Sequence, residues 1–451
     1  MNEIKNYGYI DNLGITEYFA FPIYIAIILF ISYWIQKKHI KENIIYKYYT
    51  RAVTFKLIGA IIFCLVYIYV YKGGDTISYF ESARAFTNLL FEKPSYFFKV
   101  MTEGPSIENY YLFDGRSTGY PWDYMYYDTR TLLVIKMLVP FMLLSFQSFV
   151  LTTILFSWIS FLGIWKLYTV FSIYYKKYHN QLAISILFLP SVLFWGSGIL
   201  KDTITLSASC WYIYTFYKLF ILKEKRIKNF SILLVVAFVI FSIKPYILYT
   251  LLPGSVVWGF YEKILSISSR VIRYLIIPVG LFVSVILVFY ILTSSGTFDI
   301  NTLLSEASEK QSDLKQSYYS GNTFDIGSYE PTITGALSVS PAAMAAGLFR
   351  PFIWESKNVV MLLSGIENFI YLLLSILILF RFKFGKLIKI ISSNPLLLFC
   401  LIYSLFFSLI VGLSTANFGA LVRFRIAYLP EFVSFLLVTY YLMREKKASK
   451  I

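Results

Sequence analysis

Charged residues, histidine and cysteine are all scarce in this chain of 451 residues. Only 15% of the residues are charged and 58% are hydrophobic, whereas soluble domains carry about 25% and about 45–50%. A globule of this size needs a polar surface, which this composition does not supply. The scarcity of charge therefore excludes an ordinary soluble protein.

The few cysteines and histidines exclude further classes of chemistry. Cys64, Cys210 and Cys400 all lie inside apolar blocks, so the sequence shows neither a disulfide framework nor zinc-ligand spacing. The only histidines, His39 and His179, fall in segments that we expect in the cytoplasm. Histidine-based chemistry on the outer face is therefore excluded.

The hydrophobic residues gather in blocks of roughly 17–25, the length of helix that crosses about 30 Å of hydrocarbon. In lipid, backbone hydrogen bonds must close within a segment, so these blocks are predicted to be helices; barrel-like alternation is absent. The sequence predicts an all-α, polytopic integral membrane protein with about 10–11 transmembrane helices in a single membrane domain, residues 1–451. The expected spans are roughly 17–36, 53–71, 147–169, 181–199, 203–222, 229–244, 247–261, 271–293, 358–381, 394–413 and 425–443.

Lysine and arginine mark one side of these spans. A net charge of +16 would suggest nucleic acid as the partner of a soluble protein, but here the basic residues lie at helix ends, as the positive-inside rule expects, so no nucleic-acid partner is predicted. The alternation places the N-terminus outside and the C-terminus in the cytoplasm. The basic clusters are Lys37, Lys38, Lys41, Lys47 and Arg51; Lys176 and Lys177; Lys223, Lys225, Arg226 and Lys228; Arg270 and Arg273; Arg381, Lys383, Lys386 and Lys389; and Arg444, Lys446 and Lys447.

Some segments leave alternatives open. Residues 131–145 contain Lys136 and Pro140 and are more typical of an interfacial or re-entrant segment than of a crossing. Residues 229–261 turn at Lys244-Pro245-Tyr246 and form either two spans or one re-entrant hairpin. The first block ends in Gln36-Lys37-Lys38 without a cleavage site, so no signal peptide is expected. Heavy use of Asn, Ile, Lys, Tyr and Phe is typical of an AT-rich bacterial genome, which favours a bacterial inner membrane.

Two long loops are expected on the outer face, over residues 72–130 and 294–357. The first is predicted to carry interfacial helices and ends in an aromatic run, Tyr120 to Tyr127. The second opens with a polar helical stretch, residues 301–319, and turns at Gly321-Asn322. Loops of this length in a compact protein are usually functional.

Asp75 is the leading candidate for a catalytic residue. It follows Gly73-Gly74 at the outer end of the second span, and a helix is predicted through residues 76–90. Asp75 can cap that helix, or it can act with Tyr79 at the membrane surface as a general base or as a ligand for a divalent cation. No other cofactor is indicated.

This segment, Gly-Asp-x-x-x-Tyr-x-x-x-Ala, resembles the first outer loop of membrane glycosyltransferases of the GT-C type. The resemblance implies that Asp75 is the catalytic base or a metal ligand and that the sugar comes from a polyprenyl-phosphate carrier. It covers about a dozen residues, and the chain departs from the pattern because one additional span, residues 17–36, precedes the loop.

A second resemblance lies between the fourth and fifth spans. Ser197-Gly198-Ile199-Leu200-Lys201-Asp202 looks like the outer turn of Wzy/EpsG-type polysaccharide polymerases, which implies functional roles for Lys201 and Asp202. Alternatively, Asp202 caps the next helix and Lys201 extends to the interface. Lys244 completes this outer set.

Three arginines lie on the expected outer side, against the general trend. Arg350, Arg423 and Arg425 suit a lipid-linked pyrophosphate, because a guanidinium binds two oxygens at once and stays charged. Glu431, inside the last span, is either functional or neutralises one of the arginines, and Arg350 can also pair with Glu355. The segments around these arginines look like those of bacterial cell-surface polysaccharide assembly proteins.

Together these features predict glycosyl transfer from a polyprenyl-(di)phosphate-linked sugar in cell-surface polysaccharide or glycoconjugate assembly. The expected partners are the lipid bilayer, the lipid-linked glycan and polysaccharide-assembly proteins. The alternatives are a Wzy/EpsG-type polymerase, a transporter or flippase, and a non-catalytic membrane subunit.

Overall fold

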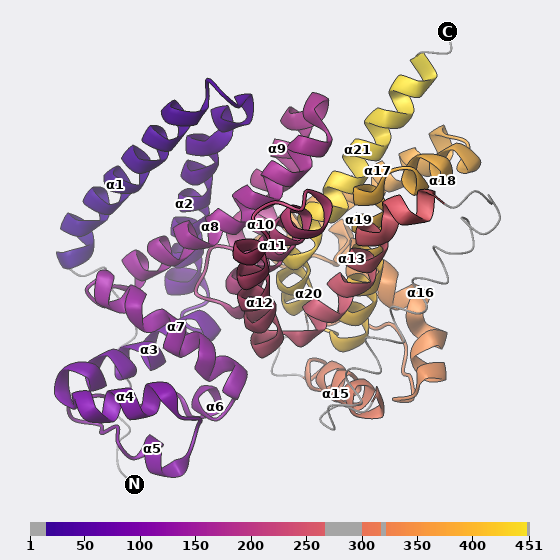
Figure 1. Cartoon of the computed structure of the whole chain (residues 1–451). Coiled ribbons are helices and arrows are strands. Elements are labelled where there is room, and N and C mark those ends of the chain that lie inside the picture. The colour runs from indigo at the N-terminus through magenta and orange to yellow at the C-terminus, as the bar shows by residue number, and fades with distance from the viewer. Residues whose placement is uncertain (1–14, 267–299, 317–321, 449–451) are drawn as a thin grey trace. The chain divides into compact units, whose positions relative to one another are not determined.

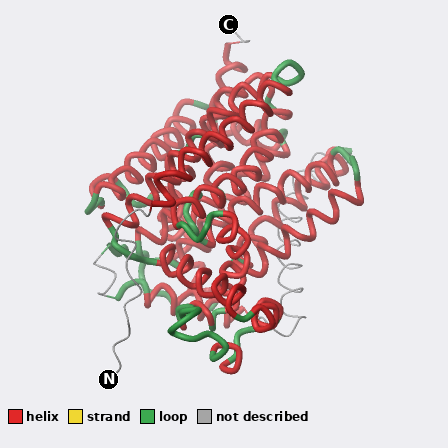
Figure 2. Tube along the Cα trace, turned by 90° about the vertical axis from the view of Figure 1, so that its left-hand side faces the viewer, coloured by secondary structure: helices red, strands yellow, loops and turns green. Residues whose placement is uncertain are grey.

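The computed structural model describes residues 15–266, 300–316 and 322–448. Throughout these ranges the regular elements are helices (Figure 2), and the only β-structure is two isolated bridges, Asp114–Gly119 and Thr323–Asn417. The all-α prediction is confirmed. The expected span 271–293, the end of the predicted helical stretch 301–319, and Gly321 lie outside the described residues.

Six helical segments of the described residues are long and apolar enough to cross a bilayer, and a bent pair brings the number to as many as seven. The chain is therefore a polytopic membrane protein, with fewer such helices in its described part than the sequence predicted. The six segments are Phe19–His39, Ile44–Val70, Phe149–Tyr174, Arg226–Ile243, Val359–Arg381 and Pro395–Ser414. The bent pair consists of Phe418–Ala427 and Leu429–Glu445, which meet at 69°.

The predicted span 181–199 is the clearest departure. It is broken into α9 (His179–Leu187) and α10 (Pro190–Trp195). Pro190 lacks a backbone N–H and disfavours helical backbone at the residue before it, which ends α9 early. The predicted spans 203–222 and 247–261 form α11 (Lys201–Phe216), which continues as a π-helical turn (Tyr217–Ile221), and α13 (Pro245–Leu265).

The chain divides into two compact units. Unit 1 comprises residues 1–169, 192–211 and 238–244, and unit 2 comprises residues 170–191, 212–237 and 245–451. Helices α8 (Phe149–Tyr174), α10, α11 and α12 (Arg226–Ile243) contribute residues to both units.

Unit 1 begins with a helical hairpin of α1 (Ile15–His39) and α2 (Tyr49–Leu65), drawn in indigo in Figure 1. Asn43 caps the short 3-10 turn between them, Ile44–Tyr48, and α2 continues as a π-helical turn, Val66–Val70. The first loop then folds into α3 (Asp75–Glu92), α4 (Pro94–Thr102), α5 (Ile107–Tyr110) and α6 (Asp123–Tyr126). Their position at the membrane interface stays a prediction. Helix α7 (Thr129–Leu144) follows and covers most of residues 131–145, the segment whose nature the sequence left open.

Unit 2 is built around α19 (Pro395–Ser414), which packs against α13 and against α16 (Ile333–Phe349). The second loop is therefore helical as well, since α16 is an apolar helix that the sequence analysis did not predict. The rest of the unit includes a 3-10 turn, Lys176–Tyr178, α9, α15 (Ile300–Asp313), a 3-10 turn, Ile353–Glu355, α17 (Val359–Arg381), α18 (Phe384–Ser392), α20 (Phe418–Phe424), a 3-10 turn, Arg425–Ala427, and α21 (Leu429–Ala448).

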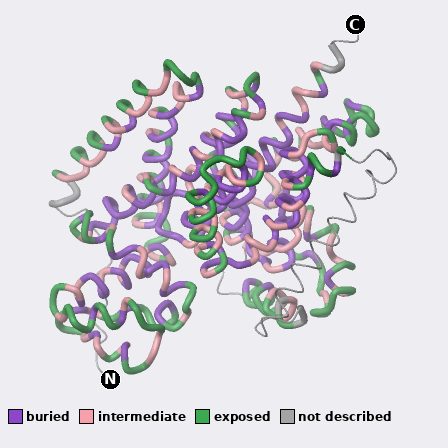
Figure 3. The backbone as a smooth tube through the Cα atoms, viewed as in Figure 1, coloured by how far each residue is buried: buried purple, intermediate pink, exposed green. Residues whose placement is uncertain are grey.

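Burial differs sharply among the apolar helices (Figure 3). Only 11% of the most apolar stretch of α1 is buried within the protein, whereas 72% of the corresponding stretch is buried in α8 and in α19. Phe19, Phe30 and Trp34 of α1 are all more than half exposed. Large exposed apolar side chains on a helix of this length are expected to contact lipid. Helix α8, most of which belongs to unit 1, and helix α19 of unit 2 are instead largely buried.

Candidate functional site

Asp75 stands at the beginning of α3 in unit 1. Gly73 and Gly74, at φ of 145° and 102°, allow the chain to turn sharply out of the preceding helix. Gly74 occupies the N-cap position and Asp75 is the first helical residue, so the predicted capping role of Asp75 is wrong. Tyr79, one turn along, is only 5% exposed and faces the interior of the unit.

Lys201, Asp202 and Lys244 lie together in unit 1 and form two ion pairs. The buried Asp202 carboxylate accepts a hydrogen bond from Lys244 Nζ at 2.5 Å, and Lys201 Nζ donates to Asp128 Oδ2 at 2.8 Å. Burial alone would raise the pKa of Asp128, but hydrogen bonds from Lys201 and Thr131 outweigh it and hold the pKa below its usual value. Charge is balanced within each pair, which favours a structural role at the ends of α7 (capped by Asp128), α11 and α12.

Lys56 is a buried charge that the sequence analysis did not consider. It lies inside α2, is 1% exposed, and its ammonium group donates to the carbonyl oxygen of Gly196. Ser160 donates to the same carbonyl oxygen at 3.4 Å. The available signal was a lone lysine within an apolar block, which in a membrane helix is uncommon enough to require a partner.

Arg350 follows α16 in unit 2, and its guanidinium is fully engaged. It donates to both carboxylate oxygens of Glu355 and, at 3.0 Å, to the backbone oxygen of Asp325. It also lies 5.0 and 5.7 Å from the ring centroids of Phe324 and Phe418. The pairing with Glu355 is one of the alternatives that the sequence left open.

Arg425 is the least satisfied of the predicted basic residues. It lies in the short turn between α20 and α21, and its side chain is completely buried. One guanidinium nitrogen donates to the carbonyl oxygen of Arg350 at 3.1 Å, whereas Nε and Nη2 have no hydrogen-bond partner in the described part of unit 2. Arg423 lies one turn earlier, half-buried, with its guanidinium 5.4 Å from the Phe424 ring centroid.

Glu431 lies in the first turn of α21 and is also completely buried. Neither of its carboxylate oxygens has a hydrogen-bond partner among the described residues. The structure therefore shows no ion pair between Glu431 and Arg425 within that part of the chain, so Glu431 does not neutralise this arginine directly.

A polar network on α17 lies close to Arg425. Glu367 accepts hydrogen bonds from Tyr371 at 2.5 Å and from the Ser191 backbone and hydroxyl, and Asn368 donates to the carbonyl oxygen of Pro351. The Tyr371 hydroxyl lies within electrostatic reach of both Glu367 and Arg425. The sequence analysis did not include this network in its candidate site, although a carboxylate and an amide at consecutive positions of an apolar helix were a visible signal.

The predicted site residues are thus divided between the two units. Asp75, Tyr79, Lys201, Asp202 and Lys244 belong to unit 1, and Arg350, Arg423, Arg425 and Glu431 belong to unit 2. Within the described ranges, no group of three or more His, Cys, Asp or Glu side chains is arranged to hold a metal ion.

Fold and site together define a polytopic α-helical membrane protein with charged residues buried among its helices. No protein-family model, curated protein sequence or solved structure matches this chain.

Proposed function

We propose that this protein transfers a glycosyl group from a polyprenyl-(di)phosphate-linked donor at the outer face of a bacterial inner membrane. The reaction serves the assembly of a cell-surface polysaccharide or glycoconjugate. Arg425, with Arg423 beside it, binds the carrier phosphate, and Asp75 is the general base for the acceptor hydroxyl.

The observation that supports this proposal is that the guanidinium of Arg425 is buried and only partly hydrogen-bonded. A buried charge costs several kcal/mol unless it is paired, and two of the three guanidinium nitrogens of Arg425 have no partner among the described residues. A phosphate oxygen accepts charge-assisted hydrogen bonds from such a group, and guanidinium is better suited to this than ammonium. Arg425 also lies at the break between two helices that meet at 69°, where the regular backbone hydrogen bonding of a helix is interrupted.

The chemistry requires one bond to form and one to break. The acceptor hydroxyl oxygen attacks the anomeric carbon, and the bond from that carbon to the phosphate oxygen breaks. The proton of the hydroxyl passes to the Asp75 carboxylate. The arginines stabilise the negative charge that develops on the departing phosphate.

Binding of a polyprenyl diphosphate to the full chain in nanodiscs tests the phosphate site. We expect Arg425→Gln to weaken binding by about 10- to 100-fold, the value of one or two charge-assisted hydrogen bonds. Arg381→Gln, at an exposed arginine of the same unit, is the matched control and should bind as the wild type does. The free polyprenol, which lacks phosphate, should show no difference between these proteins.

Folding must be separated from binding in this experiment. Arg425→Met removes an incompletely paired buried charge and should leave the thermal midpoint unchanged or raised, while carrier binding is lost. A large drop in the midpoint together with normal binding by the folded fraction would assign Arg425 a structural role and refute the phosphate site.

The second part of the proposal concerns Asp75. Asp75→Asn should abolish transfer while membrane insertion and carrier binding remain normal. Glu108→Gln, at an exposed carboxylate of the same loop, should retain transfer. Transfer by Asp75→Asn at the wild-type rate would remove Asp75 from the mechanism.

A transporter or flippase is the second candidate, favoured by the bent pair of helices that carries Arg425 and the buried Glu431. Proteoliposomes distinguish the two functions. Translocation of a lipid-linked sugar without formation of a new glycosidic bond would support transport and exclude transfer.

A further inference from the structure

Two aromatic rings at the end of the first loop are exposed on the surface of unit 1. Trp122 is 46% exposed and Tyr124 is 59% exposed, and their ring centroids lie 6.2 Å apart. Exposed rings in a membrane protein usually belong to the interfacial belt, where they pack against lipid headgroups. These two rings differ from such a belt because their backbone is held by hydrogen bonds and carboxylates lie beside them.

The backbone that carries the rings is held in place. The Trp122 N–H donates to Ser82 Oγ at 3.1 Å, and the Tyr110 hydroxyl donates to the carbonyl oxygen of Pro121 at 3.1 Å. Tyr126, two residues beyond Tyr124, is completely buried and packs edge-on against Phe113. The exposed rings are therefore presented by an ordered segment, which lowers the entropic cost of binding a ligand.

Carboxylates on α3 flank both rings. Glu81 Oε2 accepts a hydrogen bond from the Trp122 indole at 2.8 Å, and Tyr124 lies close to the Ser78 side chain and within electrostatic reach of Asp75 and Glu81. Burial raises the pKa of the Tyr124 hydroxyl, the interaction with Ser78 opposes this, and the two carboxylates add to the increase. Burial also raises the pKa of Glu81, although the indole hydrogen bond and Arg84 oppose this.

Exposed aromatic rings beside carboxylates suit the two kinds of group on a pyranose sugar. The C–H groups of a sugar form an apolar face that packs on an aromatic ring, and its hydroxyl groups donate hydrogen bonds to carboxylates. Anionic lipid headgroups are disfavoured beside Asp75 and Glu81, because like charges repel. We infer that Trp122, Tyr124 and Glu81 form a binding site for the sugar residues of an oligosaccharide acceptor, next to Asp75.

That the bound oligosaccharide is the acceptor rests on the proposed function. Oligosaccharide binding itself can be measured without any transfer. The probes are oligosaccharides released by mild acid from the surface polysaccharide of the cells that produce the protein. Their affinity for the full chain in neutral phosphatidylcholine nanodiscs is measured by saturation-transfer NMR. We expect Trp122→Ala and Tyr124→Ala to weaken binding by about 3- to 10-fold each.

Three further variants act as controls. Trp122→Phe retains a ring and should keep most of the affinity. Tyr96→Ala removes a comparably exposed ring from α4 of the same unit and should have no effect. Arg425→Gln should also leave oligosaccharide affinity unchanged, since that residue is assigned to the carrier phosphate.

The possible results separate this inference from the proposed function. Ring-dependent oligosaccharide binding without any carrier-dependent transfer would support the sugar site and refute the transferase. Transfer by the wild type with no measurable oligosaccharide binding, or equal binding by wild type and Tyr124→Ala, would refute the sugar site. Equal binding by the wild type and Tyr124→Ala would assign the exposed rings to the membrane interface.

Discussion

Six charged side chains are buried among the described residues, and they differ in how well they are satisfied. Asp202 and Lys244 neutralise each other, Lys56 donates to a carbonyl oxygen, and Glu367 accepts from neighbouring donors. Arg425 retains two nitrogens without partners in the described residues, and Glu431 two such oxygens. A folded protein rarely keeps such groups without a use, so these last two are the strongest candidates for binding or proton transfer.

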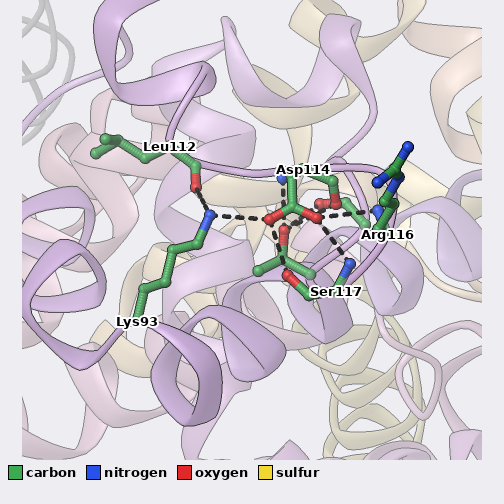
Figure 4. Close-up of polar contacts among 7 residues, drawn as sticks. Lys93, Leu112, Asp114, Arg116 and Ser117 are labelled. Atoms are coloured by element: carbon green, nitrogen blue, oxygen red, sulfur yellow. Dashed lines mark hydrogen bonds and ion pairs between the residues drawn. The ribbon is translucent and has the colours of Figure 1, made fainter.

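The first loop contains a polar cluster whose strength depends on pH (Figure 4). Lys93 Nζ donates to Asp114 Oδ2 at 2.8 Å, and the backbone N–H groups of Arg116 and Ser117 donate to Oδ1 at 2.9 and 2.7 Å. These hydrogen bonds, that of Lys93 first, hold the pKa of Asp114 well below its usual value of 3.8.

Because the folded-state pKa is depressed, the cluster stabilises the loop above about pH 4 and loses that effect as pH falls further. Asp114→Asn should therefore be cleaved faster than the wild type in this loop at neutral pH. The difference should shrink as pH falls below 4. Limited proteolysis by thermolysin at pH 7 and by pepsin below pH 4 measures both ends of this range, with Glu108→Gln as the control. A difference that is equally large at both ends would show that the Asp114 charge is irrelevant to loop stability.

At the scale of elements, α16 and α19 pack through small residues. A Cβ atom placed on Gly412 would lie 2.0 Å from the Ala343 carbonyl oxygen, and one on Gly347 would lie 2.3 Å from the Ser408 carbonyl oxygen. The spacing of each pair, Ala343 to Gly347 and Ser408 to Gly412, is four residues, so small residues on one face of each helix meet. Close backbone approach of this kind is a general means of holding membrane helices together.

Gly412→Val should therefore force the two helices apart. We expect a loss of about 1–3 kcal/mol in the free energy of unfolding, the usual cost of overpacking, and a lower thermal midpoint in detergent. Carrier binding should weaken as well, because α16 positions the Arg350 carbonyl oxygen that accepts from Arg425. Gly385→Ala is the control, since a Cβ atom there meets nothing within 4 Å. An unchanged midpoint for Gly412→Val would contradict the close packing.

The elements also show what can be predicted from the sequence. Helices α1, α2, α8, α12, α17 and α19 follow from length and hydropathy alone, because each is a long apolar block. Helix α16 was missed because, although apolar, it has only 17 residues, fewer than a predicted span needs, and Pro341 interrupts it. The candidate charges were visible in the sequence, but their partners were not. Glu81 and Trp122, or Asp202 and Lys244, are about forty residues apart, and only the fold brings them together.

For the whole molecule, the proposed transfer depends on membrane sidedness. Asp75 belongs to unit 1 and Arg425 to unit 2, and one lipid-linked substrate can use both only if their loops open to the same side of the bilayer. The distribution of lysine and arginine predicts that they do, because every basic cluster then falls in the cytoplasm. Single cysteines test this directly in a chain whose three cysteines, all buried, are replaced by alanine.

We expect Gly104→Cys in the first loop and Ser328→Cys in the second to react with an impermeant maleimide in right-side-out vesicles. Gly385→Cys on α18 should react only after the vesicles are opened. All three positions are exposed, so differences in labelling report the side of the membrane rather than burial. Labelling of Gly385→Cys alone in sealed vesicles would invert the topology but leave the two loops together. Labelling of Gly104→Cys and Ser328→Cys from opposite sides would separate the carboxylate from the arginines by the thickness of the bilayer, about 30 Å of hydrocarbon, and no single glycosyl transfer could then use both.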